Sequence, residues 1–189
     1  MRGDGRSDMP RLARGVIFLA ILLCTTGFDQ ASKQWARTLP THPANCDVPG
    51  DLVARKCGGV PQPFIENMWD WELAMNDGVA FSTFTGVRGG QIILSILAAI
   101  ALIWIGVMAA RTRPEERLKR IALALVAGGA LGNLVDRVRD GAVTDFIRWR
   151  AGEHAWPIFN IADAALLIGI GLLLIESVLA KRRRAILQT

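Results

Sequence analysis

The uncharged stretch Gln91–Ala110, QIILSILAAIALIWIGVMAA, decides the fold class of this chain. As an α-helix it is about 30 Å long, the thickness of one hydrocarbon core. Three further apolar runs surround it, at Gly15–Phe28, Ile121–Val135 and Ile158–Ile175. With 51% hydrophobic and 21% charged residues among 189, the chain is predicted to cross a membrane four times. Disordered, fibrous and water-soluble classes are excluded.

The distribution of basic residues predicts the topology. The stretches before the first span, between the second and third, and after the fourth hold thirteen of the 22 Lys and Arg residues but only five of the 17 Asp and Glu residues. Because Lys and Arg concentrate on the cytoplasmic side, both termini are expected in the cytoplasm. A nucleic-acid partner is not expected, because no basic stripe with interleaved aromatic residues remains once the topology is assigned.

The spans organise the chain into one four-span domain, 13–180, between a disordered cytoplasmic tail, 1–12, and a basic cytoplasmic tail, 181–189. Spans are expected at about 15–35, 90–110, 119–137 and 158–178, with a long outer segment at 38–87. The predicted fold class is an all-α membrane protein, a four-transmembrane-helix bundle with a small extracytoplasmic β-rich cradle.

The second half of the outer segment alternates apolar and polar residues. One face collects Trp69, Trp71, Leu73 and Met75, and the other collects Asp70, Glu72 and Asn76. This period of two predicts a strand. Its tryptophans are expected at the level of the lipid headgroups.

Three cysteines and the first apolar run leave alternatives open. The first run has the basic start of a signal peptide, but Gly27-Phe28-Asp29-Gln30 offers no cleavage site of small residues, so a retained helix is expected. Cys24, within it, is expected to be a buried, inert thiol. Cys46 and Cys57, in the oxidising outer compartment, either form a disulfide or stay free.

Ionisable residues gather near the outer ends of three spans. They are Asp29 and Lys33 in the first, Asn133, Asp136 and Arg137 in the third, and Asn160 and Asp163 in the fourth, with Asp145 between the last two spans. Such groups are costly against lipid, so they are expected to face the bundle interior and mark a functional site. Asp29 and Lys33, at i,i+4, are equally consistent with a structural pair.

Three of these acids, Asp136, Asp145 and Asp163, are expected around one gap. Two close carboxylates in a poorly solvated site share one proton, which suits acid–base catalysis. Asp136 is followed by Arg137 and is expected to form an ion pair with it. Asp145 and Asp163 have no adjacent cation, which modestly favours them as the catalytic pair. Gly128 and Gly132 are expected to let a neighbouring helix approach closely.

The chain resembles bacterial lipoprotein signal peptidase, the type II signal peptidase family of intramembrane aspartic proteases. The resemblance covers roughly residues 15–178. It rests on four blocks in the family's order: Asp29-Gln30-Ala31-Ser32-Lys33, Asn76 through Ser82, Gly132-Asn133-Leu134-Val135-Asp136-Arg137 through Val143-Thr144-Asp145-Phe146, and Phe159-Asn160-Ile161-Ala162-Asp163. Val79 replaces a usual Ala, and the outer loop is longer than usual.

The resemblance implies that Asp145 and Asp163 form a catalytic dyad that activates water and cleaves before a diacylglyceryl-modified cysteine. Substrate-binding or dyad-supporting roles fall to Asn76, Gly78, Asn133, Asp136, Arg137, Asn160, Asp29 and Lys33. The expected partners are prolipoprotein substrates and membrane lipids. A monomer in the bacterial inner membrane is expected, with the site near the outer face.

No cofactor or metal is expected, since His42 and His154 are scattered outside the membrane blocks. Two other classes compete with the peptidase. A small transporter or channel would place its ionisable groups near the midplane and break spans in corresponding halves. A structural membrane subunit would explain neither the carboxylates nor the asparagines.

Overall fold

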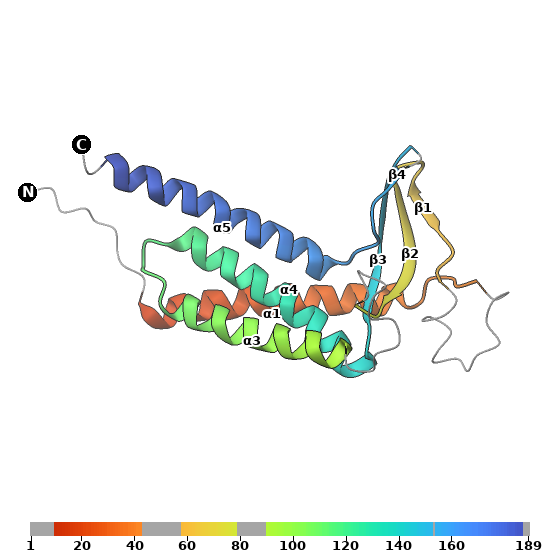
Figure 1. Cartoon of the computed structure of the whole chain (residues 1–189), viewed down its shortest axis with the longest axis horizontal. Helices are drawn as coiled ribbons and strands as arrows, with labels where there is room; N and C mark the ends of the chain where they lie inside the picture. Colours follow the sequence, from red (N-terminus) through yellow and green to blue (C-terminus); the bar gives the residue numbers. More distant parts are fainter. Residues whose placement is uncertain (1–9, 43–57, 79–89, 153, 187–189) are drawn as a thin grey trace, which may run out of the picture.

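The computed structural model describes residues 10–42, 58–78, 90–152 and 154–186. Four long helices form a bundle, and a small sheet lies at one end of it (Figure 1). All four helices are long and apolar enough to cross a membrane. The expected class, four spanning helices with a small β-rich unit, is confirmed.

The helices are α1 (Arg11–Ala36), α3 (Gly90–Ala110), α4 (Arg117–Asp140) and α5 (Ile161–Ile186). α1 therefore includes Arg11 and Leu12, and α5 continues through residues 181–186, which the sequence assigns to tails. The expected fourth span starts too early, because residues 158–160 precede the helix. Residues 1–9 and the proposed Cys46–Cys57 disulfide lie outside the described residues.

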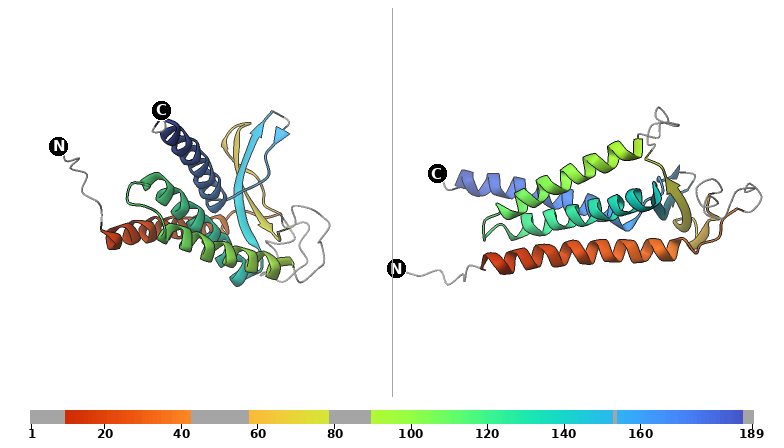
Figure 2. Two further views of the ribbon diagram at one scale, coloured as in Figure 1. Left: turned by 60° about the vertical axis from the view of Figure 1, so that its left-hand side comes forward. Right: turned by 90° about the horizontal axis from the view of Figure 1, so that it is seen from below.

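α4 is the central helix and packs against α1, α3 and α5 (Figure 2). Its glycines permit these contacts. A Cβ on Gly128 would lie 2.7 Å from the side chain of Thr25 in α1, and one on Gly129 would lie 2.4 Å from the carbonyl of Ala162 in α5. The predicted close approach at Gly128 and Gly132 is confirmed, and it brings the polar residues of three helices together.

The outer faces of α1, α3 and α5 carry exposed apolar side chains, as expected of surfaces in contact with lipid. Cys24 is one of the exposed residues of α1. The prediction of a buried thiol is therefore wrong, because α4 covers the opposite face of α1, which carries Asp29 and Lys33.

The sheet has four antiparallel strands in the order β1 (Gln62–Ile65), β2 (Trp69–Asn76), β3 (Val143–Ala151) and β4 (His154–Ala155). The strand expected at Trp69–Met75 is β2. Its main partner is β3, which joins α4 to the segment before α5. Phe159 also forms a bridge with Ile147, so the segment just before α5 lies beside β3.

A bulge interrupts the alternation expected in β2. Trp71 pairs with Ile147, but Ala74 pairs with Asp145, so β2 has one more residue than β3 between these pairs. In addition, Asp70, expected on the polar face, is buried and forms an ion pair with Arg150. Before the bulge the predicted faces are nevertheless kept. Asp70 and Glu72 pair with Arg150 and Arg148, and the rings of Trp69 and Trp71 contact each other with centroids 5.0 Å apart.

Aromatic side chains connect the sheet to the bundle. Trp71 stacks on Phe146 of β3 with ring centroids 6.0 Å apart, and Trp35, in the last turn of α1, meets Trp71 edge-on at 5.2 Å. Such pairs add to the free energy gained by burial. They fix β3 against the end of α1, and therefore fix the position of Asp145, which precedes Phe146.

Candidate active site

A buried ammonium group lies at the centre of the polar residues. Lys33 in α1 is fully buried, and its Nζ lies 2.8 Å from Asp29 Oδ2 and 3.1 Å from Asp136 Oδ2. It also donates to Asn133 Oδ1 at 2.9 Å. An ammonium has three donors, and here each has an oxygen acceptor. Lys33 therefore joins α1 to α4 through two polar contacts in the interior, to Asp136 and Asn133, and pairs with Asp29 within α1.

Asp136 is held by α1 and by the sheet, not by its neighbour in sequence. Besides Lys33, its carboxylate lies 3.7 Å from the Arg37 guanidinium and accepts hydrogen bonds from Gln30 and from the backbone N–H of Thr144. The expected Asp136–Arg137 ion pair is wrong. Consecutive residues on a helix are 100° apart, so their side chains leave in different directions.

Asn133 links Lys33 to Asp163 through hydrogen bonds on the two sides of its amide. Because its Oδ1 accepts from Lys33, its Nδ2 is directed away and donates to Asp163 Oδ1 at 2.8 Å. Asn160 Nδ2 also donates to Asn133 Oδ1, at 3.1 Å. The orientation of this amide is thus determined by a cation on one side and a carboxylate on the other.

Asn160 and Asp163 form a capping box at the start of α5. The Asp163 backbone N–H donates to Asn160 Oδ1 at 3.0 Å, and Asp163 Oδ2 accepts from the Asn160 backbone N–H at 3.3 Å. Asp29 Oδ1 accepts the next free donor, the Ala162 N–H, at 2.9 Å. The i,i+3 spacing therefore has a structural role as well as placing Asp163 in the site.

Asp145 in β3 is held by two amide groups. Asn160 Nδ2 donates to Oδ1 at 2.6 Å, and Asn76 Nδ2 donates to Oδ2 at 3.0 Å. Asn76 is oriented in turn by Gly78, whose N–H donates to Asn76 Oδ1 at 2.8 Å. Gly78 has φ +79°, which favours glycine, and a Cβ there would lie 2.4 Å from Leu94.

The two carboxylates share an electrostatic environment. Burial raises the pKa of the Asp145 carboxyl to about 7, and the nearby Asp163 carboxylate acts in the same direction, against the amide donors of Asn76 and Asn160. Near neutral pH a proton on Asp145 is thus accessible. Two neighbouring carboxyl groups, one of which holds a proton, can supply an acid and a base in the same site.

Arg137 differs from the other site residues because it has no polar partner among those described. Its Nε is buried without a hydrogen-bond acceptor in the described part of the chain. Its charge acts on Asp163 and Asp145 but forms no ion pair with either. This guanidinium therefore has donors available beside the two carboxylates.

The structure thus brings together the candidate site residues that the sequence singles out, at the sheet end of the bundle. Sequence reasoning missed Arg37 and Thr144. Arg37 lies beside the Asp136 carboxylate, and Thr144 donates its backbone N–H to Asp136 and accepts from Arg37 through its hydroxyl. The spacing of Asp29, Lys33 and Arg37, each four residues apart, would have indicated Arg37.

The location of the polar residues at one end of the bundle disfavours a channel with charges near the membrane midplane. Among the described residues no group of three or more His, Cys, Asp or Glu side chains is arranged to hold a metal ion.

Four membrane-spanning helices with two amide-held aspartates at one end, Asp145 buried and Asp163 partly exposed, define an aspartic hydrolase of the membrane. Residues 21–179 match the family model described as signal peptidase (SPase) II. Relatives include a lipoprotein signal peptidase of Xanthomonas campestris, 36% identical over 89% of this chain and 93% of the relative, and one of Xylella fastidiosa, 34% identical over 87% and 91%.

A solved structure described as a bacterial membrane enzyme, at 1.9 Å resolution, is similar with a TM-score of 0.69 and 27% identity, over 85% of this chain and 91% of that one. The chain belongs to the signal peptidase II family, the aspartic peptidases that remove signal peptides from prolipoproteins. It is a multi-pass membrane protein with bacterial relatives.

Replacing Lys33 tests the central contact. Lys33→Met leaves Asp29 and Asp136 buried without their shared cation, so the free energy of unfolding should fall by about 3–5 kcal/mol. The matched control is Lys119→Met, because Lys119 forms a partly exposed ion pair with Glu116; it should cost less than about 1 kcal/mol. Unfolding in detergent measures both, and equal effects would contradict the central role of Lys33.

The raised pKa of Asp145 predicts a pH-dependent stability. Between the ordinary value of 3.8 and about 7, the folded chain holds a proton that the unfolded chain has lost, so this residue destabilises the fold increasingly as pH rises. Asp145→Asn removes the effect. Its free energy of unfolding relative to the parent should therefore rise from pH 4 to pH 7 and stay level above. Glu66→Gln, in an exposed turn, should show no such trend, and a flat difference for Asp145→Asn would refute the assignment.

Proposed function

We propose that Asp145 and Asp163 are the catalytic dyad of this peptidase and that the scissile bond precedes a diacylglyceryl-modified cysteine. The observation that carries the proposal is that Asn160 holds both carboxylates, through its side chain for Asp145 and through its backbone N–H for Asp163. The substrate is inferred from the resemblance and from the family membership. The dyad is complete within one chain, so the enzyme is proposed to act as a monomer, and no nucleic acid is a partner.

The surroundings assign different roles to the two acids. Asp163 lies in the first turn of α5, where the helix dipole stabilises negative charge, and it is more accessible than Asp145. Asp145 is 2% exposed, and burial favours its protonated form. We therefore assign Asp163 as the base and Asp145 as the acid.

The reaction then proceeds with a water molecule between the carboxylates. Asp163 takes a proton from the water as its oxygen attacks the scissile carbonyl, and Asp145 gives its proton to the carbonyl oxygen. In the second step the proton on Asp163 passes to the amide nitrogen as the C–N bond breaks. Asp145 recovers its proton as the carboxyl product forms. No step requires a metal or a cofactor.

Arg137 is proposed to bind the peptide backbone of the substrate. Asn76, Asn133 and Asn160 use their amide donors on the two carboxylates or on each other. By contrast, Arg137 keeps a buried Nε without an acceptor in the described structure. A substrate carbonyl beside the dyad would satisfy this donor, which holds the scissile bond in position.

The sheet end is proposed to face the extracytoplasmic side of the bacterial inner membrane, with both termini in the cytoplasm. Arginines at the sheet end, such as Arg37, Arg148 and Arg150, have carboxylate partners. At the opposite end, where α1 begins and α5 ends (Figure 1), the described residues Arg11, Arg14, Lys181 and Arg182 form no ion pair with a described carboxylate. This asymmetry is the one that the positive-inside rule describes. In this proposed orientation the dyad lies at the outer interface, where water is available.

Substitution of either aspartate tests the dyad. Asp145→Asn and Asp163→Asn should each reduce cleavage of a purified, lipid-modified preprolipoprotein in detergent at least about a thousandfold, since each removes an acid or a base. Both variants should still bind the substrate. Asp77→Asn, an exposed neighbour of the site, is the control and should retain activity. Substantial turnover by either dyad variant would exclude that residue from catalysis.

Replacing Arg137 should weaken the binding and positioning of the substrate but leave the stability of the fold unchanged. Arg137→Gln should lower kcat/KM about tenfold, because a charge-assisted hydrogen bond to the substrate is lost. Its Tm should stay within a few degrees of the parent. The control is Arg139→Gln on the exposed face of the same helix, where activity should be unchanged. A large fall in Tm with normal kcat/KM would instead indicate a structural role.

A further inference from the structure

A second polar region lies at the end of the bundle away from the sheet. A cavity of about 720 Å³ is enclosed by the start of α1, the end of α3, the α3–α4 connection and the first turn of α4. Five arginines line it: Arg11, Arg14, Arg111, Arg113 and Arg120. No residue of the proposed dyad network contributes to it. The peptidase reaction described above leaves this cavity without a role.

Arg120 is the residue that requires explanation. It is only 3% exposed, and its Nε is buried without an acceptor in the described part of the chain. One of its terminal nitrogens donates to the Arg113 carbonyl at 2.9 Å. Arg14 donates to the Thr112 carbonyl at 3.3 Å, and its Nε is likewise buried without an acceptor among the described residues. The positive-inside rule accounts for exposed arginines, but it does not account for buried, unpartnered ones.

The positive charge in the cavity has no counterion in the described structure. None of the five guanidinium groups forms an ion pair with a described carboxylate. The nearby acid, Glu116, accepts from the Arg113 backbone N–H at 2.7 Å and pairs with Lys119 at 3.5 Å. Burying a cation without an anion is costly, so this arrangement calls for an anionic ligand.

Apart from Thr112, the rest of the lining is apolar, and it opens toward lipid. Gly15, Phe18, Leu19, Gly106, Ala109 and Ala110 form this part of the wall. Leu19 is 53% exposed on the outer face of α1, within a membrane-spanning helix. A ligand of the cavity would therefore have a negatively charged group among the arginines and a hydrocarbon part beside α1 and α3.

We infer that this cavity binds an anionic phospholipid of the cytoplasmic leaflet, with the phosphate among the arginines and an acyl chain along Leu19 and Gly106. The phosphate oxygens accept from Arg14 and Arg120, which satisfies their free donors. The helix ends place the arginines at headgroup depth, given the orientation proposed above. A free inorganic anion would leave the apolar wall unused.

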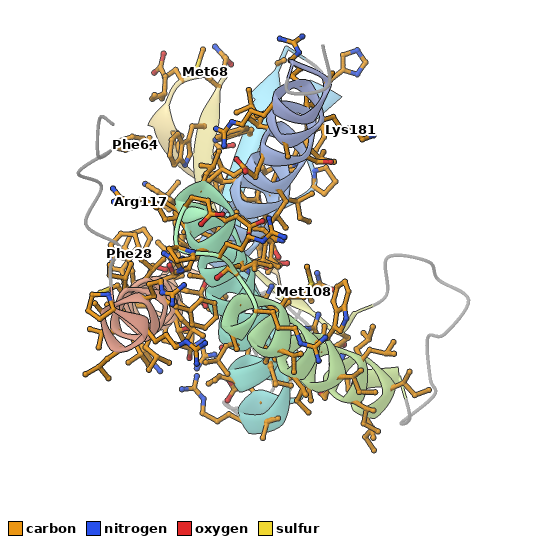
Figure 3. The ribbon with its side chains drawn as sticks, turned by 90° about the vertical axis from the view of Figure 1, so that its left-hand side faces the viewer. Phe28, Phe64, Met68, Met108, Arg117 and Lys181 are labelled. Carbon is orange, nitrogen blue, oxygen red and sulfur yellow. The ribbon has the colours of Figure 1, made fainter. Side chains whose placement is uncertain are left out.

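Lipid binding without substrate tests this inference, so the result does not depend on cleavage. Native mass spectrometry of the detergent-purified protein would compare phosphatidylglycerol with phosphatidylcholine of the same acyl chains. The parent protein should prefer phosphatidylglycerol by about tenfold or more. Arg14→Gln/Arg120→Gln should abolish the preference. The control pair Lys181→Gln/Arg182→Gln removes two charges from α5, on which Figure 3 labels Lys181, and should keep the preference.

A steric variant covers the case in which the double arginine variant fails to fold. A Cβ at Gly106 meets no atom within 4 Å, so Gly106→Leu places a side chain in the cavity without altering any charge. It should lower phosphatidylglycerol binding about tenfold, whereas Gly171→Leu, equally open but on α5, should not. Equal binding of both lipids by the parent, unchanged binding by Gly106→Leu, or equal thermal protection by inorganic phosphate alone would overturn the inference.

Discussion

The buried ammonium of Lys33 is the contact on which the rest of this structure depends. Two carboxylates and one amide oxygen surround it, in the interior of a helix bundle where each would be costly alone. The same carboxylates also reach beyond it. Asp29 accepts from the start of α5, and Asp136 accepts from the start of β3. One cation therefore sets the relative positions of α4, β3 and α5, which carry Asn133 and the two acids of the proposed dyad.

A single asparagine connects helix formation with the proposed chemistry. Asn160 caps α5 through its Oδ1 and holds Asp145 through its Nδ2. The amide has both an acceptor and a donor, so one side chain serves both elements. Its cap partner is Asp163, the other proposed catalytic acid. The Asn160–Asp163 cap that starts α5 thus also positions the two proposed catalytic acids.

Much of this was accessible from the sequence because the strongest patterns are local. Long uncharged runs predict the four helices, and polar residues within apolar runs identify the site. The partner of Asp136 was not accessible, because it depends on which face of α1 packs against Gly132. The bulge in β2 and the strand β3 were missed for the same reason. Strand register and helix contacts are decided by tertiary packing. Adjacency in sequence suggested Arg137 as the partner of Asp136, but packing brings Lys33 to it instead.

The aromatic contacts between Trp35, Trp71 and Phe146 have a consequence for biogenesis. Asp145 belongs to the sheet and Asp163 to the bundle, so the two acids meet only when β3 is docked against the end of α1. A chain with its four helices inserted but its sheet undocked has half of the acid pair. With the proposed dyad, proteolytic competence therefore requires docking of the sheet as well as insertion of the helices.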